Sequence, residues 1–145
     1  GEIYTVWGSL GFERGALGLP TSRDADPVML MSEGVFMYLQ PDTVTAVLQT
    51  FAERAPAGSV FTFDAMCWLS IGRAKQHTSV KHTDAQFHWG PRRENELNQL
   101  HPRLHLAASQ QVMGDYNLFY RYLQPLFKAL TGVPLYAIYR LEVSA

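Results

Sequence analysis

The stretch from Val28 to Leu39 constrains the fold of this chain more than any other part of the sequence. Its first four residues are all apolar, a pattern that is typical of a parallel strand buried on both faces. The strand is predicted to end at Ser32-Glu33-Gly34. Ligands of open α/β sheets bind at the carboxyl ends of the strands, and glycine has no Cβ to obstruct them, so Glu33 is a candidate binding residue. A solvated loop acid or a helix cap would explain Glu33 equally well.

A helix and a second strand are predicted directly after this stretch. Pro41 stands where a first helical residue would, and apolar residues then recur at helical spacing until Pro56-Ala57-Gly58. Residues 60–63 predict the next strand, which ends in Asp64. A strand, a helix and a strand within about forty residues predict a right-handed βαβ unit and therefore an α/β fold.

The remaining predicted elements are shorter or less regular. Residues 3–7 are rich in β-branched and aromatic residues and predict a short strand, while residues 92–100 predict a short helix. Residues 103–107 alternate like a strand. A helix is predicted over residues 113–131, with a kink or a break at Pro125, and residues 135–141 predict the last strand.

Length and composition predict one soluble α/β domain over residues 1–145. The chain is 47% hydrophobic and 12% aromatic, so it can bury a single core. Its net charge of −1 offers no basic surface for a nucleic acid partner. No apolar run approaches the ~20 residues of a membrane span, so no membrane partner is predicted. The single cysteine, Cys67, cannot form an internal disulfide, which fits a reducing cytoplasm.

Common catalytic and metal-binding signatures are missing from the sequence. It contains no G-x-S-x-G motif, no P-loop and no cysteine pair with zinc spacing. The five histidines lie in a predicted loop and strand, and Pro102 prevents a helical i, i+4 pair of His101 and His105, so no metal site is predicted. Cys67 follows a strand, where a nucleophile could stand, but a small buried thiol explains it better.

Residues 33–39 read E-G-V-F-M-Y-L and are followed by a Pro-Asp helix start and a strand that ends in Asp64. This order resembles the E-G-V-L-M-Y-L pattern of the leucine carboxyl methyltransferase family. Its bacterial branch, which includes the tetracenomycin-type polyketide O-methyltransferases, is the closer match. The resemblance extends from about Trp7 to the C-terminus, and its specific part is residues 33–64. It implies a Rossmann-like class I methyltransferase fold with S-adenosylmethionine as the cofactor.

The resemblance also implies which residues contact the cofactor. Glu33 matches the glutamate that contacts the cofactor at the end of the family's fourth strand. Ser9 and Leu10 match a turn beside the adenine, although relatives often have Asp where this chain has Ser9. Tyr38 matches the tyrosine of the motif, where the ring could equally serve packing.

The resemblance places the methyl acceptor on less defined parts of the chain. The loop over residues 68–89 and the helix that carries Tyr116, Tyr120 and Tyr122 would face the substrate, and no catalytic residue is assigned. A carboxylate acceptor is ionised at neutral pH and needs no base, whereas a phenol with a pKa of ~10 would benefit from one. The lack of an obvious paired base favours a carboxylate over a phenol oxygen of a small molecule such as a polyketide.

The chain departs from the family at its N-terminus. A class I methyltransferase has a glycine-rich loop after its first strand and a ribose-binding acid after its second, and this sequence begins after both. We therefore expect the C-terminal portion of an enzyme, one incomplete methyltransferase domain that is inactive alone. Four strands should lie side by side in the family order 4-5-7-6, formed by residues 28–31, 60–63, 135–141 and 103–106. The seventh strand, residues 135–141, should be antiparallel.

A truncated sheet also has consequences for association. In the truncated sheet, residues 28–31 should form an exposed apolar edge. Unpaired strand edges and uncovered faces recruit other strands, so the chain is expected to self-associate or to pair with the missing N-terminal half. The alternative to an enzyme is a non-enzymatic α/β module, derived from a truncated methyltransferase, that serves binding or oligomerisation.

Overall fold

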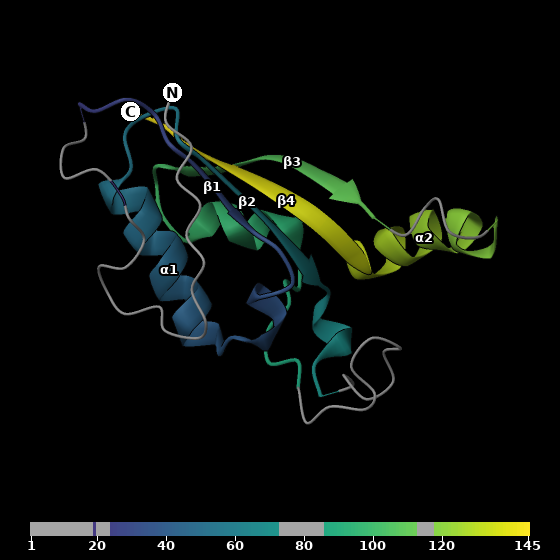
Figure 1. Cartoon of the computed structure of the whole chain (residues 1–145). Coiled ribbons are helices and arrows are strands. Elements are labelled where there is room, and N and C mark those ends of the chain that lie inside the picture. The colour runs from purple at the N-terminus through teal and green to yellow at the C-terminus, as the bar shows by residue number, and fades with distance from the viewer. Residues whose placement is uncertain (1–18, 20–23, 73–85, 113–117) are drawn as a thin grey trace.

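The computed structural model describes residues 19, 24–72, 86–112 and 118–145. Its regular elements lie around one sheet (Figure 1). The strands and α-helices are β1 (Met29–Ser32), α1 (Pro41–Arg54), β2 (Val60–Met66), β3 (Leu104–Gln111), α2 (Leu118–Thr131) and β4 (Tyr136–Val143). Short 3-10 helices in the described residues connect them, namely η1 (Phe36–Tyr38), η2 (Trp68–Ser70) and η4 (Glu94–Gln99).

The four strands form one mixed sheet in the order β1-β2-β4-β3. β1 pairs parallel with β2, whereas β4 is antiparallel to both β2 and β3. The α/β class is therefore confirmed, and the four strands lie in the predicted order with the predicted antiparallel strand. The predicted strand at residues 3–7 lies outside the described residues.

Helix α1 covers one face of the sheet, as its apolar spacing predicts. Pro41 begins the helix, and Val44, Leu48 and Phe51 are buried against the strands. Phe36, from η1, stacks on Phe63 of β2 with ring centroids 4.4 Å apart. The core thus joins the segment after β1, the helix and the central strand, which fixes the position of the chain between β1 and α1.

The opposite face of the sheet, which we call the open face, is exposed at β1 (Figure 1). Met29 is 61% exposed and Met31 is 70% exposed, and Ile138 of β4 is also exposed. The prediction that the first strand is buried on both faces is therefore wrong. Its unbroken apolar run reflects a strand at the edge of the described sheet whose side chains meet α1 on one face only.

Several element boundaries differ from the sequence prediction. The short helix predicted over residues 92–100 is the 3-10 helix Glu94–Gln99, and the described part of the helix predicted over residues 113–131 is Leu118–Thr131, with Pro125 inside it. Strand β3 extends to Gln111, past its apolar alternation, because its backbone continues to pair with β4. A bulge between Leu106 and Ala108 interrupts that pairing.

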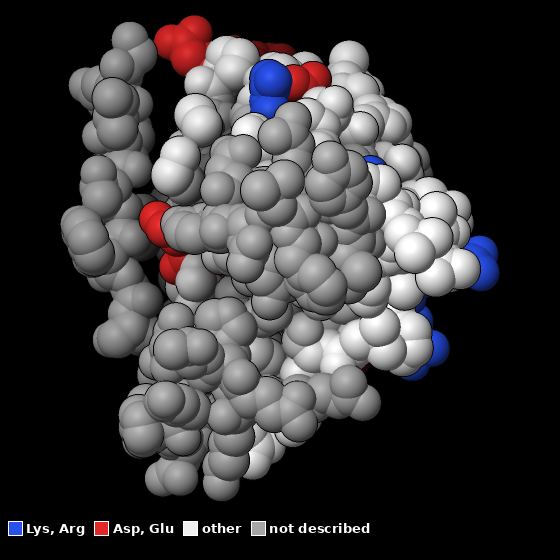
Figure 2. All heavy atoms as spheres, turned by 90° about the vertical axis from the view of Figure 1, so that its right-hand side faces the viewer, with Lys and Arg blue, Asp and Glu red and all other residues white. Residues whose placement is uncertain are grey.

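Figure 2 shows the side of the molecule that includes α2. The described charged side chains are spread around this face, and at its top a basic side chain lies against an acidic one. No helix of the described part is long and apolar enough to cross a membrane.

The core assignment can be tested with one truncation at two sites. Leu48 on α1 is 0% exposed, whereas Leu130 on α2 is 78% exposed. Leu48→Ala should lower the free energy of unfolding by about 2–5 kcal/mol, because it leaves a cavity among packed side chains. Leu130→Ala should change it by less than about 0.5 kcal/mol. Urea unfolding of both variants measures the difference, and equal losses would contradict the packing of α1.

Candidate functional site

The carboxyl ends of β1 and β2 and the start of β4 lie together at one end of the strands, which we call the carboxyl edge of the sheet. Because β1 and β2 are parallel and β4 is antiparallel to β2, the ends of β1 and β2 lie beside the start of β4. Glu33 and Gly34 directly follow β1, Asp64 lies in the last half of β2, and Tyr136 is the first residue of β4. Carboxyl edges of this kind are where α/β sheets bind ligands.

Asp64 links these strand ends through both of its carboxylate oxygens. Its Oδ1 accepts a hydrogen bond from the backbone N–H of Gly34 at 2.6 Å, and its Oδ2 accepts one from the Tyr136 hydroxyl at 2.5 Å. The side chain is only 4% exposed. A buried carboxylate is costly unless it is hydrogen-bonded, so these two donors are what allow Asp64 to remain at this position.

The turn after β1 is open to an approaching ligand. Glu33 is exposed, as is Gly34, whose φ of 67° lies in the left-handed region that glycine adopts readily. A Cβ built at Gly34 would meet no atom within 4 Å. Glu33 therefore lies where the sequence placed it, at the carboxyl end of a strand, and its contact with a cofactor stays a prediction.

An apolar cluster, which we call the apolar wall, is joined to Asp64 through Tyr136. Met37 of η1, Met66 of β2 and Phe87 form a buried cluster, with Tyr38 and Tyr136 packed against it. The Tyr38 and Phe87 rings are 5.3 Å apart. Met37 and Met66 thus lie together in this cluster, whereas Met29 and Met31 lie on the open face.

The segment that carries Phe87 is fixed against the strands. The backbone N–H groups of His88 and Trp89 both donate to the carbonyl oxygen of Met37. Gly90 lies so close to β2 that a Cβ built on it would be 2.2 Å from the carbonyl oxygen of Met66. This end of the predicted substrate-facing loop therefore lines the carboxyl edge.

The two tyrosines at this edge remain protonated at neutral pH. Burial raises the pKa of Tyr136 above its usual value of 10.0, and its hydrogen bond to Asp64 and the charges of Asp64 and Glu33 raise it further. Burial and the charge of Asp64 also raise the pKa of Tyr38. Both phenols can donate hydrogen bonds to a ligand or a neighbour, and neither is suited to act as a base.

Cys67 also lies at this edge, directly after β2, whereas Ser9, Leu10 and Tyr116 lie outside the described residues. Tyr120 and Tyr122 belong to α2, and their side chains are outside the described part as well. Cys67 is buried, and burial raises the pKa of its thiol, which disfavours a nucleophilic thiolate. No group of three potential metal ligands occurs among the residues that the structure describes.

The sequence does not predict the central position of Asp64 or any role for Tyr136. Its pattern identifies Asp64 only as the end of a strand and Tyr136 only as part of the last strand. Because the last strand was predicted to be antiparallel, its first residue could have been placed at the carboxyl edge. Their hydrogen bond spans 72 residues of sequence, which no local pattern indicates.

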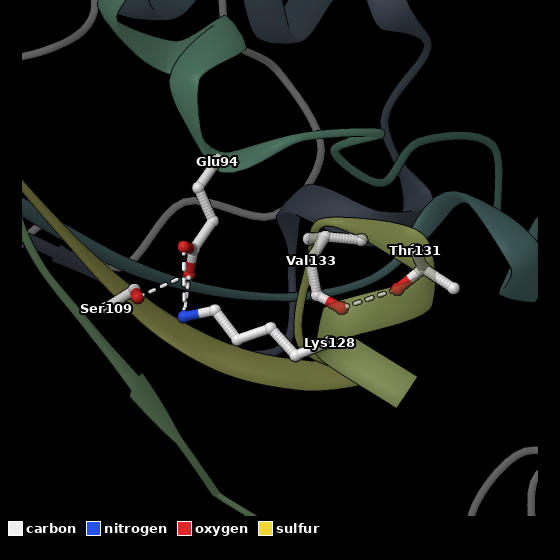
Figure 3. Close-up of polar contacts among 5 residues, drawn as sticks. All are labelled: Glu94, Ser109, Lys128, Thr131 and Val133. Atoms are coloured by element: carbon white, nitrogen blue, oxygen red, sulfur yellow. Dashed lines mark hydrogen bonds and ion pairs between the residues drawn. The ribbon is translucent and has the colours of Figure 1, made fainter. Parts of the chain in front are cut away.

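A second polar cluster anchors α2 (Figure 3). Glu94 of η4 accepts hydrogen bonds from Ser109 of β3 and Lys128 of α2. The Lys128 Nζ is 3.0 Å from the Glu94 Oε2. Thr131 ends the helix by donating to the carbonyl oxygens of Phe127 and Val133. The cluster joins three elements, and we assign it a structural role.

Two tyrosines of β4 should respond differently to removal of the hydroxyl group. Tyr136→Phe removes a donor from buried Asp64 and should lower the free energy of unfolding by about 1–3 kcal/mol. The buried Tyr139 hydroxyl has no hydrogen-bond partner among the described residues. Tyr139→Phe is therefore expected to be neutral or to stabilise the fold by up to about 1 kcal/mol. Chemical unfolding at pH 7 measures both changes, and a larger loss for Tyr139→Phe would contradict the assigned hydrogen bond between Tyr136 and Asp64.

The same pair of variants predicts the alkaline pH dependence. Burial also raises the pKa of Tyr139, so both tyrosines stay protonated in the fold at a pH where they ionise in the unfolded chain. Their contribution to stability is complete below pH 10 and falls as the pH rises above that value. Each Phe variant should lose stability less steeply than the unmodified chain between pH 9.5 and 11, in the same unfolding experiments, by about 1 kcal/mol or more.

Comparison with known proteins adds no family to this geometry: no protein-family model matches the chain, and a search of the curated proteins finds no match either.

Proposed function

We propose that this chain is the C-terminal part of a cytoplasmic O-methyltransferase of the class I type, which uses S-adenosylmethionine. The observation that carries the proposal is the open Glu33-Gly34 turn at the carboxyl edge. This turn begins the E-G-V-F-M-Y-L motif on which the family resemblance rests. The order β1-β2-β4-β3, with β4 antiparallel, supports it further because the resemblance implies this arrangement for strands 4-5-7-6.

The residues at the carboxyl edge fit the proposed cofactor chemically. The exposed Glu33 carboxylate is suited to accept hydrogen bonds from sugar hydroxyls, which are donors. The partly buried rings of Tyr38 and Tyr136 cover the buried side chains of Met37, Met66 and Phe87, and the Tyr38 ring lies against Phe87. Aromatic and thioether groups suit a large organic cation, since ring faces attract positive charge and sulfur is polarisable. When bound, S-adenosylmethionine would supply an electrophilic methyl group.

The part of this chain in the reaction would be to bind and align rather than to remove a proton. Neither Tyr38 nor Tyr136 is suited to be a base, because their pKa values are raised. Holding the acceptor oxygen in line with the methyl group would supply most of the rate. An acceptor that is already ionised needs nothing more, so we propose a carboxylate of a small molecule, with a phenol oxygen of a compound such as a polyketide as the second choice.

Glu33 provides the direct test of the enzyme proposal. In a protein that joins this chain to the N-terminal half of the domain, Glu33→Ala should weaken cofactor binding by about 1.5–3 kcal/mol, because a charge-assisted hydrogen bond is lost. Calorimetry measures the affinity. Asp26→Ala is the matched control, because Asp26 is an exposed acid that precedes β1, at the opposite edge of the sheet.

Two results would contradict this proposal. Unchanged cofactor affinity in Glu33→Ala would remove Glu33 from the site. Micromolar binding of S-adenosylmethionine by the 145-residue chain alone would place the cofactor site elsewhere, because the glycine-rich loop and the ribose-binding acid are expected to supply much of the affinity.

The open face favours a second candidate function, a non-enzymatic module for binding or oligomerisation. Met29 and Met31 are exposed on β1, which forms one edge of the described sheet. Exposed apolar strands at a sheet edge recruit further strands or apolar partners. In the enzyme proposal the same surface would pair with the N-terminal half of the domain, so self-association of the isolated chain is expected under both functions.

Self-association can be assigned to this surface by charge substitution. The isolated chain should dimerise or aggregate, and Met29→Lys with Met31→Lys should shift it toward the monomer, because two exposed lysines oppose edge pairing. Light scattering at several concentrations measures the change. Leu126→Lys with Leu130→Lys is the control, since these residues are exposed and apolar on α2. A monodisperse 16.4 kDa monomer of the unmodified chain would contradict the prediction.

A further inference from the structure

We propose that Asp64 is a positioning residue that holds the Glu33-Gly34 turn in its binding conformation by joining it to Tyr136. The part of this proposal that concerns the conformation of the turn is independent of the proposed function. The part that concerns cofactor affinity rests on the proposed function. Nothing in the family resemblance assigns this role to the acid at the end of the second strand.

The link is built from two different parts of the chain. Gly34 is 30 residues from Asp64 in sequence, and Tyr136 is 72 residues away on the other side. Each donates to a different oxygen of the same carboxylate. A carboxylate held by two donors has little freedom to rotate, so the position of Tyr136 is passed on to the backbone of the turn.

The turn depends on this link more than its neighbours do. Phe36, two residues beyond Gly34, is fully buried, and Ser32 pairs with Phe63 in the sheet. Between these two anchors, Glu33 and Gly34 are both exposed. Gly34 can adopt many backbone conformations, so its hydrogen bond to Asp64 is what selects the one with a φ of 67°.

Two substitutions distinguish the effect of the charge of Asp64 on the turn from the effect of its shape. Asn has nearly the same shape, and its amide oxygen could still accept from the Gly34 N–H while its NH2 group donates to the Tyr136 oxygen. Asp64→Asn should therefore keep much of the link without the charge, whereas Asp64→Ala should abolish it. Tyr136→Phe should leave the Gly34 bond in place but release one side of the carboxylate.

Ser59 gives a matched control at the other end of the same two strands. Its Oγ accepts a hydrogen bond from the backbone N–H of Val28 at 3.1 Å, and the side chain is buried. Ser59→Ala thus removes a buried side-chain contact that joins β1 to β2, as Asp64→Ala does, but at the edge opposite to the turn. Comparing Ser59→Ala with Asp64→Ala therefore distinguishes a local effect on Gly34 from a general loss of fold stability.

The first experiment measures amide hydrogen exchange in the 145-residue chain by NMR. Exchange at Gly34 should become at least about tenfold faster in Asp64→Ala and less so in Asp64→Asn, since the charged hydrogen bond that protects this amide is lost in the first and replaced by a neutral one in the second. Ser59→Ala should speed exchange at Val28 and leave Gly34 within about twofold of the unmodified chain. Equal exchange at Gly34 in all variants, or equal acceleration in Asp64→Ala and Ser59→Ala, would overturn the proposal.

The second experiment measures S-adenosylmethionine binding by the protein that includes the N-terminal half. Asp64→Ala should raise the dissociation constant by about tenfold, Asp64→Asn should restore part of the affinity, and Ser59→Ala should leave it unchanged. Full loss in Asp64→Asn would mean that the carboxylate contacts the ligand itself and would overturn the positioning role. If the unmodified protein does not bind the cofactor, the proposed function fails, while the exchange result still decides the link between Asp64 and the turn.

Discussion

The opposite directions of the two neighbours of β2 are the constraint on which the rest of the structure depends. β1 runs parallel to β2 and β4 runs antiparallel to it, so two strand ends and one strand start lie at the same edge. Helix α1 is the crossover that the parallel pair requires, and its apolar residues cover the face that contains Phe61 and Phe63. The carboxyl edge combines acids and aromatic rings because of this topology, since its residues come from three separate segments.

The sequence predicted best those parts whose side chains follow a simple period. The helical spacing of Val44, Leu48 and Phe51 predicts α1. Apolar and β-branched residues predict the strands that precede and follow this helix in the chain. The apolar run of β1 predicts burial on both faces, which is wrong. Such a run does not indicate which strands and helices actually cover the two faces. The polar end of β3 was missed for the opposite reason, since Ser109 and Gln111 are placed in a strand by backbone pairing with β4.

The candidate site was predictable only in part. Glu33 was found because it ends an apolar run beside a glycine, which is a local signal. The link from Asp64 to Tyr136 joins two strands that are neighbours in the sheet and distant in the sequence, so it required the topology to be known. Raised pKa values of the two tyrosines arise from burial and from that neighbouring carboxylate, and neither cause can be read from residue identity alone.

The close approach of Gly90 to β2 has an entropic consequence for any ligand at the carboxyl edge. Any larger residue at this position would force the backbone away from Met66, and with it the Phe87 side of the apolar wall. As the chain stands, this wall is already assembled by backbone hydrogen bonds to Met37. A ligand that settles against it has few protein groups left to order, so more of its contact energy would be retained as affinity.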